Sequence, residues 1–306
     1  MFETIELKNT IGDLLDSQTE RYGDREALVH VEAGTRLTYR EFKAECDRVA
    51  RGLMAVGIDK GQHVGIWVTN YLEWVVAQFA TAKIGAVLVT VNPSYRTHEL
   101  EYVLKQSEAN ALILIGQFRT SDYVSMANEV IVELKDSAPG ELRSSKLPYL
   151  RNVIFIPQPS APETKTPDGM WSWQDIREKS AEVSETELVR RQASCHPDDT
   201  INIQYTSGTT GLPKGAMITH GMVFYNAVNI SGPALITPES KHLSVLPLFH
   251  IAGLNIFSNP VFHAGGTVVV TQTFDPAESL SLLSDRAQAF THFFGVPANY
   301  LFISQQ

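Results

Sequence analysis

Apolar runs with β-strand character alternate with amphipathic segments along the first half of the chain. Strands are predicted at residues 64–68, 86–91 and 111–115, and helices at 71–84, 98–106 and 124–134. Strands that are apolar along their whole length are typical of a parallel sheet covered on both faces, because each crossover helix must return across the sheet. The pattern therefore predicts an α/β fold with mostly parallel sheets flanked by helices.

Two of the predicted helices begin at residues that are suited to capping. Thr38 and Glu41 have the spacing of a capping box at a helix start. Asn70 and Glu73 form a looser, Asn-led version of the same pattern, and Gly85 can end that helix. We assign a structural role to both pairs.

A second set of elements follows residue 196. Strands are predicted at 201–206, 243–246, 267–271 and 292–296, and helices at 221–230 and 276–289. The stretch 157–168 contains four prolines and shows no periodicity, so it is typical of an exposed loop or linker. We therefore expect one domain over 1–306 with two sub-lobes, about 1–156 and 196–306, joined by an irregular segment.

Composition and charge restrict the partners and the compartment. The 306 residues are 43% hydrophobic and 19% charged, which excludes disordered and collagen-like chains. A net charge of −9 opposes binding to a phosphate backbone, so nucleic acid is not expected as a partner. The only cysteines, Cys46 and Cys195, lack the spacing of a zinc site and fit a reducing compartment. No signal-peptide pattern or membrane-length apolar run is found, so a soluble, cytoplasmic protein is predicted.

The segment with the clearest chemical character runs from Tyr205 to Met217, between a predicted strand and a predicted helix. Its glycines let backbone N–H groups turn toward an anion, and its hydroxyls can donate hydrogen bonds to phosphate oxygens. A Walker A loop does not fit, because Pro213 stands where that loop needs its second glycine and Gly215 where it needs a hydroxyl. The predicted phosphate-binding residues are Thr206, Ser207, Gly208, Thr209, Thr210, Gly211 and Lys214.

This segment closely resembles the phosphate-loop signature of the adenylate-forming (AMP-binding) superfamily, which includes acyl-CoA synthetases, nonribosomal-peptide adenylation domains and luciferases. Further resemblances follow one another along the chain at residues 37–42, 92–96, 246–250 and 295–297. The second and third of these look most like the fatty-acyl and medium-chain acyl-CoA synthetase branch. The resemblance covers nearly the whole chain and implies the N-terminal part of the large domain of such an enzyme.

The resemblance implies a two-step reaction. A carboxylate attacks the α-phosphorus of ATP to give an acyl-adenylate and pyrophosphate, and coenzyme A then takes the acyl group; magnesium accompanies the ATP. By the family pattern, Thr206 to Lys214 hold the β- and γ-phosphates, with Thr206 on the magnesium side. His250 resembles the residue beside the acyl carboxylate, and Gly295-Val296-Pro297 resembles a segment that lines the acyl pocket. From the residues alone, a core histidine and a simple strand-to-helix turn would explain these positions equally well.

Nothing after Pro297 corresponds to the later signatures of the superfamily for adenine, ribose and the hinge, and the C-terminal lid domain with its lysine has no counterpart. We therefore expect an N-terminal fragment with little or no activity by itself, for which a complementary C-terminal half would be a partner. Two alternatives stay open. One is an aryl- or amino-acid-activating enzyme, and the other is a noncatalytic binding or regulatory fragment.

Overall fold

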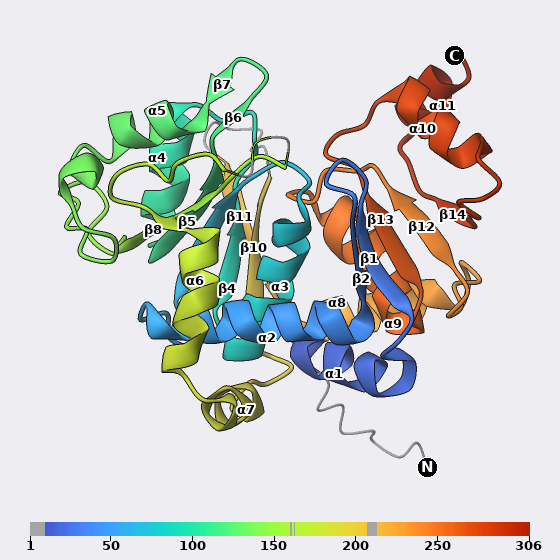
Figure 1. The fold of residues 1–306 in the computed structure, drawn as a ribbon, viewed down its shortest axis with the longest axis horizontal. Helices are drawn as coiled ribbons and strands as arrows, with labels where there is room; N and C mark the ends of the chain where they lie inside the picture. Colours follow the sequence, from blue (N-terminus) through green and yellow to red (C-terminus); the bar gives the residue numbers. More distant parts are fainter. Residues whose placement is uncertain (1–9, 160, 162, 207–212) are drawn as a thin grey trace.

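The computed structural model describes residues 10–159, 161, 163–206 and 213–306. Two sheets stand next to each other, with helices packed around and between them (Figure 1). Neighbouring strands run parallel in both sheets except for one antiparallel pair in each, β10 with β11 and β1 with β2. The predicted α/β architecture of mostly parallel sheets flanked by helices is confirmed.

The larger sheet has seven strands. In spatial order they are β11 (Lys214–Thr219), β10 (Thr200–Thr206), β4 (Val87–Thr90), β3 (His63–Trp67), β5 (Ala111–Ile115), β8 (Asn152–Ile156) and β9 (Trp171–Ser172). Strands β4, β5 and β8 are buried along their whole length, as expected of central strands that are covered on both faces.

The smaller sheet has five strands. In spatial order they are β14 (His292–Phe293), β12 (Lys241–Ser244), β13 (Thr267–Val270), β1 (Glu26–His30) and β2 (Thr35–Thr38). A separate hairpin of β6 (Gln117–Phe118) and β7 (Ser121–Asp122) follows β5.

The helices fill the space around and between the sheets. They are α1 (Ile11–Tyr22), α2 (Tyr39–Ala55), α3 (Leu72–Ile84), α4 (Thr97–Gln106), α5 (Tyr123–Val130), α6 (Trp173–Lys179), α7 (Glu185–Ala193), α8 (His220–Ser231), α9 (Asn259–Ala264), α10 (Pro276–Ser284) and α11 (Pro297–Ile303), with short 3₁₀ turns η1 (Leu134–Asp136) and η2 (Ser180–Glu182) and the π-helix η3 (Ala252–Ser258). Helix α3 contacts β4 of the larger sheet and β1 of the smaller one, and nearly all of it is buried. It therefore lies between the sheets, where a helix needs apolar residues on every side.

The two sheets divide the chain differently from the sub-lobes expected at 1–156 and 196–306. Strands β10 and β11 come from the later part of the chain, but β10 pairs with β4 in the larger sheet. Strands β1 and β2 come from the start, but β1 pairs with β13 in the smaller sheet. The segment between the predicted sub-lobes contains β9, α6, η2 and α7, so only part of it is irregular. Such long-range pairings leave no trace in local periodicity.

One of the two predicted helix caps is confirmed and the other is wrong. Thr38 and Glu41 form the complete capping box of α2. Helix α3 instead has Tyr71 as its N-cap and no side-chain capping bond, because the Asn70 side chain is engaged elsewhere. Gly85 ends α3 with φ +71°, a left-handed conformation that suits glycine.

Candidate active site

The predicted functional residues lie at one edge of the two sheets. Strand β10 runs parallel to β4 in the larger sheet, and β12 and β14 run parallel to each other in the smaller sheet, so the carboxyl ends of these parallel strands point the same way within each sheet. In Figure 1 the carboxyl ends of both sheets are at the top. Thr206 is the last residue of β10, His250 follows β12, and Gly295 follows β14. In open α/β sheets, this edge is where ligands bind.

Two antiparallel strands carry the described ends of the predicted phosphate segment, Thr206 on β10 and Lys214 on β11. Strand β11 begins at Lys214 and pairs antiparallel with β10, a strand that the sequence analysis missed. The register sets Thr206 directly opposite Lys214, so both side chains stand on the same face of the sheet, and both are exposed. The remaining predicted phosphate residues, Ser207, Gly208, Thr209, Thr210 and Gly211, lie outside the described residues.

Helix α4 holds the base of this hairpin. The hydroxyl of Tyr102 donates to the carbonyl oxygen of Pro213 at 3.1 Å. The hydroxyl of Tyr205 donates to the side-chain oxygen of Gln106, and burial raises the pKa of Tyr205 to about 12, so the phenol stays protonated and can donate. The strand ends that carry Thr206 and Lys214 are thereby fixed to α4.

His250 is exposed and stands just before the π-helix η3. The backbone N–H of Ala252 donates to its Nδ1 at 3.1 Å, so in the neutral imidazole the proton is on Nε2. An exposed Nε2–H is a donor for an anion such as a carboxylate. π-Helices are rare in proteins, and those that occur often lie at functional sites.

The π-helix connects the three parts of the site. Its Asn255 donates to Asn202 of β10 at 3.3 Å and accepts from Gln78 of α3 at 3.2 Å. Its Phe257 stacks on Phe294 with ring centroids 4.6 Å apart. One element thus contacts the strand that carries Thr206 and the segment that leads to Gly295, and it begins beside His250.

Gly295-Val296-Pro297 forms the turn from β14 into α11. The N–H of Val296 donates to Asn299 at 2.8 Å, and Pro297 takes the first helical position, where its missing N–H costs nothing. Val296 is 49% exposed. The residues make the predicted strand-to-helix turn, and at least Val296 keeps an exposed surface.

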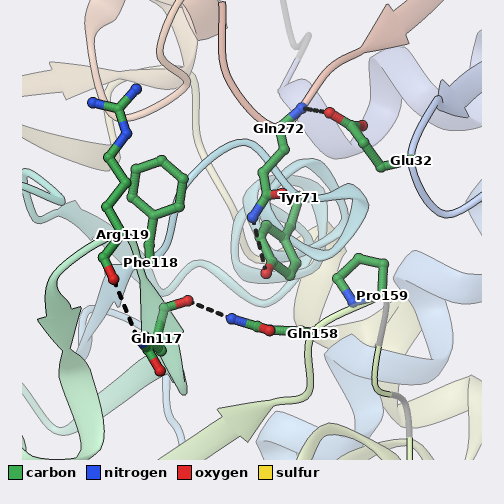
Figure 2. A pocket seen from close by; sticks show the side chains of 8 residues that line it. All are labelled: Glu32, Tyr71, Gln117, Phe118, Arg119, Gln158, Pro159 and Gln272. Carbon is green, nitrogen blue, oxygen red and sulfur yellow. Dashed lines mark hydrogen bonds between the residues drawn. The ribbon is translucent and has the colours of Figure 1, made fainter.

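A polar cavity of about 420 Å³ lies at the same edge and was missed by the sequence analysis (Figure 2). The backbone N–H of Gln272 donates to Glu32 at 2.6 Å, and its side-chain amide donates to the Tyr71 hydroxyl at 3.2 Å. Across the cavity, Gln158 bonds to the carbonyl of Gln117. The amides and the exposed Arg119 guanidinium suit polar ligand groups. No motif marks these residues, because they come from five separate parts of the chain: the segments that follow β1, β3, β8 and β13, and the β6 hairpin.

Asn70 is the other functional candidate that sequence reasoning missed, since its spacing from Glu73 indicated only a helix cap.

A metal site made of protein side chains alone is not found: the described ranges contain no group of three or more His, Cys, Asp or Glu side chains that could hold a metal ion. Thr206 supplies one exposed hydroxyl at the hairpin, which fits magnesium held mainly by phosphate oxygens. None of the helices in the described part is long and apolar enough to cross a membrane.

Comparison with known proteins agrees with this arrangement. A model of the AMP-binding enzyme family matches residues 15–305. YngI of Bacillus subtilis (strain 168), which is named as an acyl-CoA synthetase, is 40% identical over 295 residues, covering 96% of this chain and 52% of YngI. Human mitochondrial medium-chain acyl-CoA ligase ACSF2 is 35% identical over 303 residues, covering 97% of this chain and 48% of the ligase. The crystal structure of the anthranilate CoA ligase AuaEII in complex with anthranoyl-AMP superimposes with a TM-score of 0.79 at 22% identity, over 98% of this chain and 53% of that one. The chain spans about half the length of the curated relatives it matches.

Proposed function

The chain belongs to the AMP-binding enzyme family, and we propose that a protein carrying it activates a carboxylic acid with ATP. The products of the first step are an acyl-adenylate and pyrophosphate. In the second step the acyl group passes to coenzyme A, which gives an acyl-CoA. Its named relatives are acyl-CoA synthetases and ligases, so the enzyme class is an acid–thiol ligase.

The observation that carries the proposal is the β10–β11 hairpin, which sets Thr206 opposite Lys214 at the carboxyl edge of the larger sheet. The first step joins two anions, so charge neutralisation and in-line placement matter more than proton transfer. We assign Lys214 to the β- and γ-phosphates, together with residues 207–211, and Thr206 to the magnesium side. Magnesium supplies further positive charge when it is bound with ATP.

We assign His250 to the carboxylate. Its Nε2–H is the free donor, because Nδ1 already accepts from Ala252. A carboxylate oxygen bound there is held for attack on the α-phosphorus, and no proton needs to move. We assign Gly295-Val296-Pro297 to the wall of the acyl pocket, next to the stacked rings of Phe257 and Phe294.

A fatty or medium-chain acid is the substrate that we favour. The support is the 35% identity to a ligase named for medium-chain acids and the apolar ring pair beside the assigned pocket wall. An aryl acid is the second candidate, favoured by the fold shared with a ligase named for anthranilate. An amino acid is the third member of the acid panel to be tested.

The complete reaction is proposed for a protein that spans the whole length of its relatives. For the 306 residues alone we propose little or no turnover, because the remaining half of those relatives has no counterpart in the chain. Removal of one preorganised transition-state donor costs about 10²- to 10³-fold in rate. A noncatalytic role in binding ATP or acid is the alternative for the isolated chain, and a cytoplasmic location stays a prediction.

Carboxylate-dependent release of pyrophosphate tests the proposal. It is measured for the 306-residue chain and for a version extended to the length of its relatives, each with a medium-chain fatty acid, an aryl acid and amino acids. We expect turnover by the extended protein with the fatty acid and almost none by the short chain. His250→Ala should raise the half-saturating acid concentration, whereas His98→Ala, at an exposed histidine on α4, should not. Equal rates for both lengths, or no acid dependence at all, would contradict the proposal.

A further inference from the structure

Asn70 joins the two sheets through four hydrogen bonds. Its side-chain nitrogen donates to the carbonyl oxygen of Leu246 at 3.0 Å, and its side-chain oxygen accepts from the N–H of Leu248 at 2.8 Å. Its backbone N–H donates to the carbonyl oxygen of Gln272 at 3.3 Å, and its own carbonyl accepts from Nε2 of His30 at 3.2 Å. Asn70 is only 4% exposed, so water does not replace these partners.

The four partners come from the carboxyl ends of three neighbouring strands in the smaller sheet. His30 is the last residue of β1, Gln272 follows β13, and Leu246 and Leu248 follow β12. Asn70 itself follows β3, two strands away from β10 in the larger sheet. A single side chain and its peptide groups therefore connect the edge that carries the phosphate hairpin to the edge that carries His250.

Short contacts couple the position of residues 246–248 to that of His250. The N–H of His250 donates to the carbonyl oxygen of Pro247 at 3.1 Å. A Cβ added to Gly253 would lie 2.4 Å from that same carbonyl oxygen, so the π-helix backbone packs directly against this segment. The π-helix in turn holds Nδ1 of His250 through the N–H of Ala252. Displacing residues 246–248 would therefore displace the imidazole.

We infer that Asn70 is a positioning residue of the active site: its side-chain amide sets the placement of His250 relative to the Thr206–Lys214 hairpin. The inference rests on the proposed function. Adenylate formation needs the carboxylate at His250 and the phosphates at the hairpin to meet in line, and an error of about 1 Å can cost about 10²-fold in rate. Asn70 touches neither reactant and acts through Leu246 and Leu248.

Asn152 offers a matched control. It is also a buried asparagine, 2% exposed, and its side chain also donates to a backbone carbonyl, that of Val56 at 3.1 Å, and accepts from one N–H, that of Trp171 at 3.0 Å. These bonds stay within the part of the fold around the larger sheet, away from His250. Asn152→Ala thus removes the same number of buried hydrogen bonds without loosening the link between the sheets.

The first experiment compares single-turnover adenylate formation for Asn70→Ala and Asn152→Ala in the protein extended to the length of its relatives, under conditions where both variants are folded. We expect Asn70→Ala to lower the rate at saturating ATP by about 10- to 100-fold, with the half-saturating ATP concentration within about 2-fold of wild type. Asn152→Ala should change neither. Equal effects of the two variants would show a merely structural role and overturn the inference.

The second experiment uses the 306-residue chain and measures amide hydrogen exchange at Leu248. Exchange should accelerate in Asn70→Ala, because the N–H loses its acceptor, but not in Asn152→Ala. If Asn70→Ala fails to fold, Asn70→Asp keeps the acceptor for Leu248 and replaces the donor to Leu246 by a carboxylate oxygen, which breaks that bond; a wild-type rate in that variant overturns the inference. A wild-type protein that forms no adenylate with any acid contradicts the proposed function instead, while the exchange result still reports on the link itself.

Discussion

Lys83 is the charged residue whose loss should cost the fold most. It is 1% exposed at the end of α3, and its Nζ lies 2.7 Å from Asp16 of α1 and 2.6 Å from Asp47 of α2. Lys43 contacts the same two aspartates at 3.5 and 2.5 Å but is one third exposed. Lys83 therefore neutralises two carboxylates at the point where three helices meet.

The substitution Lys83→Met keeps the apolar stem and removes the charge. Removing one partner of a buried ion pair costs about 3–5 kcal/mol. The side chains of Asp16 and Asp47 are 33% and 21% exposed, and both still have Lys43 as a partner in the variant. We therefore expect a smaller loss of unfolding free energy, about 2–3 kcal/mol. Lys43→Met should cost at most about 1 kcal/mol, the value of a solvent-exposed pair.

The stability contributed by the Lys83 ion pairs should depend on pH in a definite direction. Burial by itself raises the pKa of Asp16, but the charge and hydrogen bond of Lys83, with Gln192 and Lys43, outweigh it and hold the pKa below its usual value of 3.8. A lowered carboxyl pKa contributes stability that is present above pH 3.8 and is lost as pH falls through the native value. The difference between wild type and Lys83→Met should therefore be constant above about pH 5 and shrink below about pH 4.

Urea unfolding followed by circular dichroism measures both expectations. Lys83→Met and Lys43→Met are compared at pH 7 and at points down to pH 3.5. A loss in Lys83→Met no greater than in Lys43→Met, or a difference that grows in acid, would refute the electrostatic reasoning. ATP binding should not change, since the cluster lies where α1, α2 and α3 meet and not at the edge that carries the hairpin.

Three shorter predictions follow. Lys214→Ala should weaken ATP binding and slow adenylate formation with an unchanged unfolding midpoint, because the side chain is exposed, and Lys214→Arg should rescue only in part; calorimetry and single-turnover kinetics check this. Gly253→Ala should lower the melting temperature and the adenylation rate together, because the added Cβ would lie 2.4 Å from the Pro247 carbonyl oxygen; wild-type values for both would contradict the packing. Burial lowers the pKa of His220 to about 4, so the unfolded state binds a proton at this residue before the folded state does, and the free energy of unfolding should fall as pH falls from 6.5 to 4. His220→Gln should reduce the slope of unfolding free energy against pH by up to about 1.4 kcal/mol per pH unit, measured by urea titrations.

Local sequence determined much of the secondary structure. Strands β3, β5 and β10 and helix α4 lie within two residues of their predicted bounds, because an apolar run or a helical period is a property of neighbouring residues. The capping box of Thr38 and Glu41 and the left-handed Gly85 follow equally from local rules. The resemblance carried by residues 205–217 also gave the correct family, since the spacing of glycines and hydroxyls is itself local.

Tertiary structure decided how these elements combine. β11 was missed, because Lys214 and the glycine after it give no strand signal until β10 pairs with them. His220, which follows the phosphate hairpin in sequence, is fully buried, and its Nδ1 accepts from the N–H of Ile11, a residue 209 positions earlier in the chain. Asn70 has the local pattern of a helix cap, yet its amide bonds to residues 176 and 178 positions away. Local periodicity cannot encode such partners, because a buried polar group takes whichever donor or acceptor the packed sheets bring within reach.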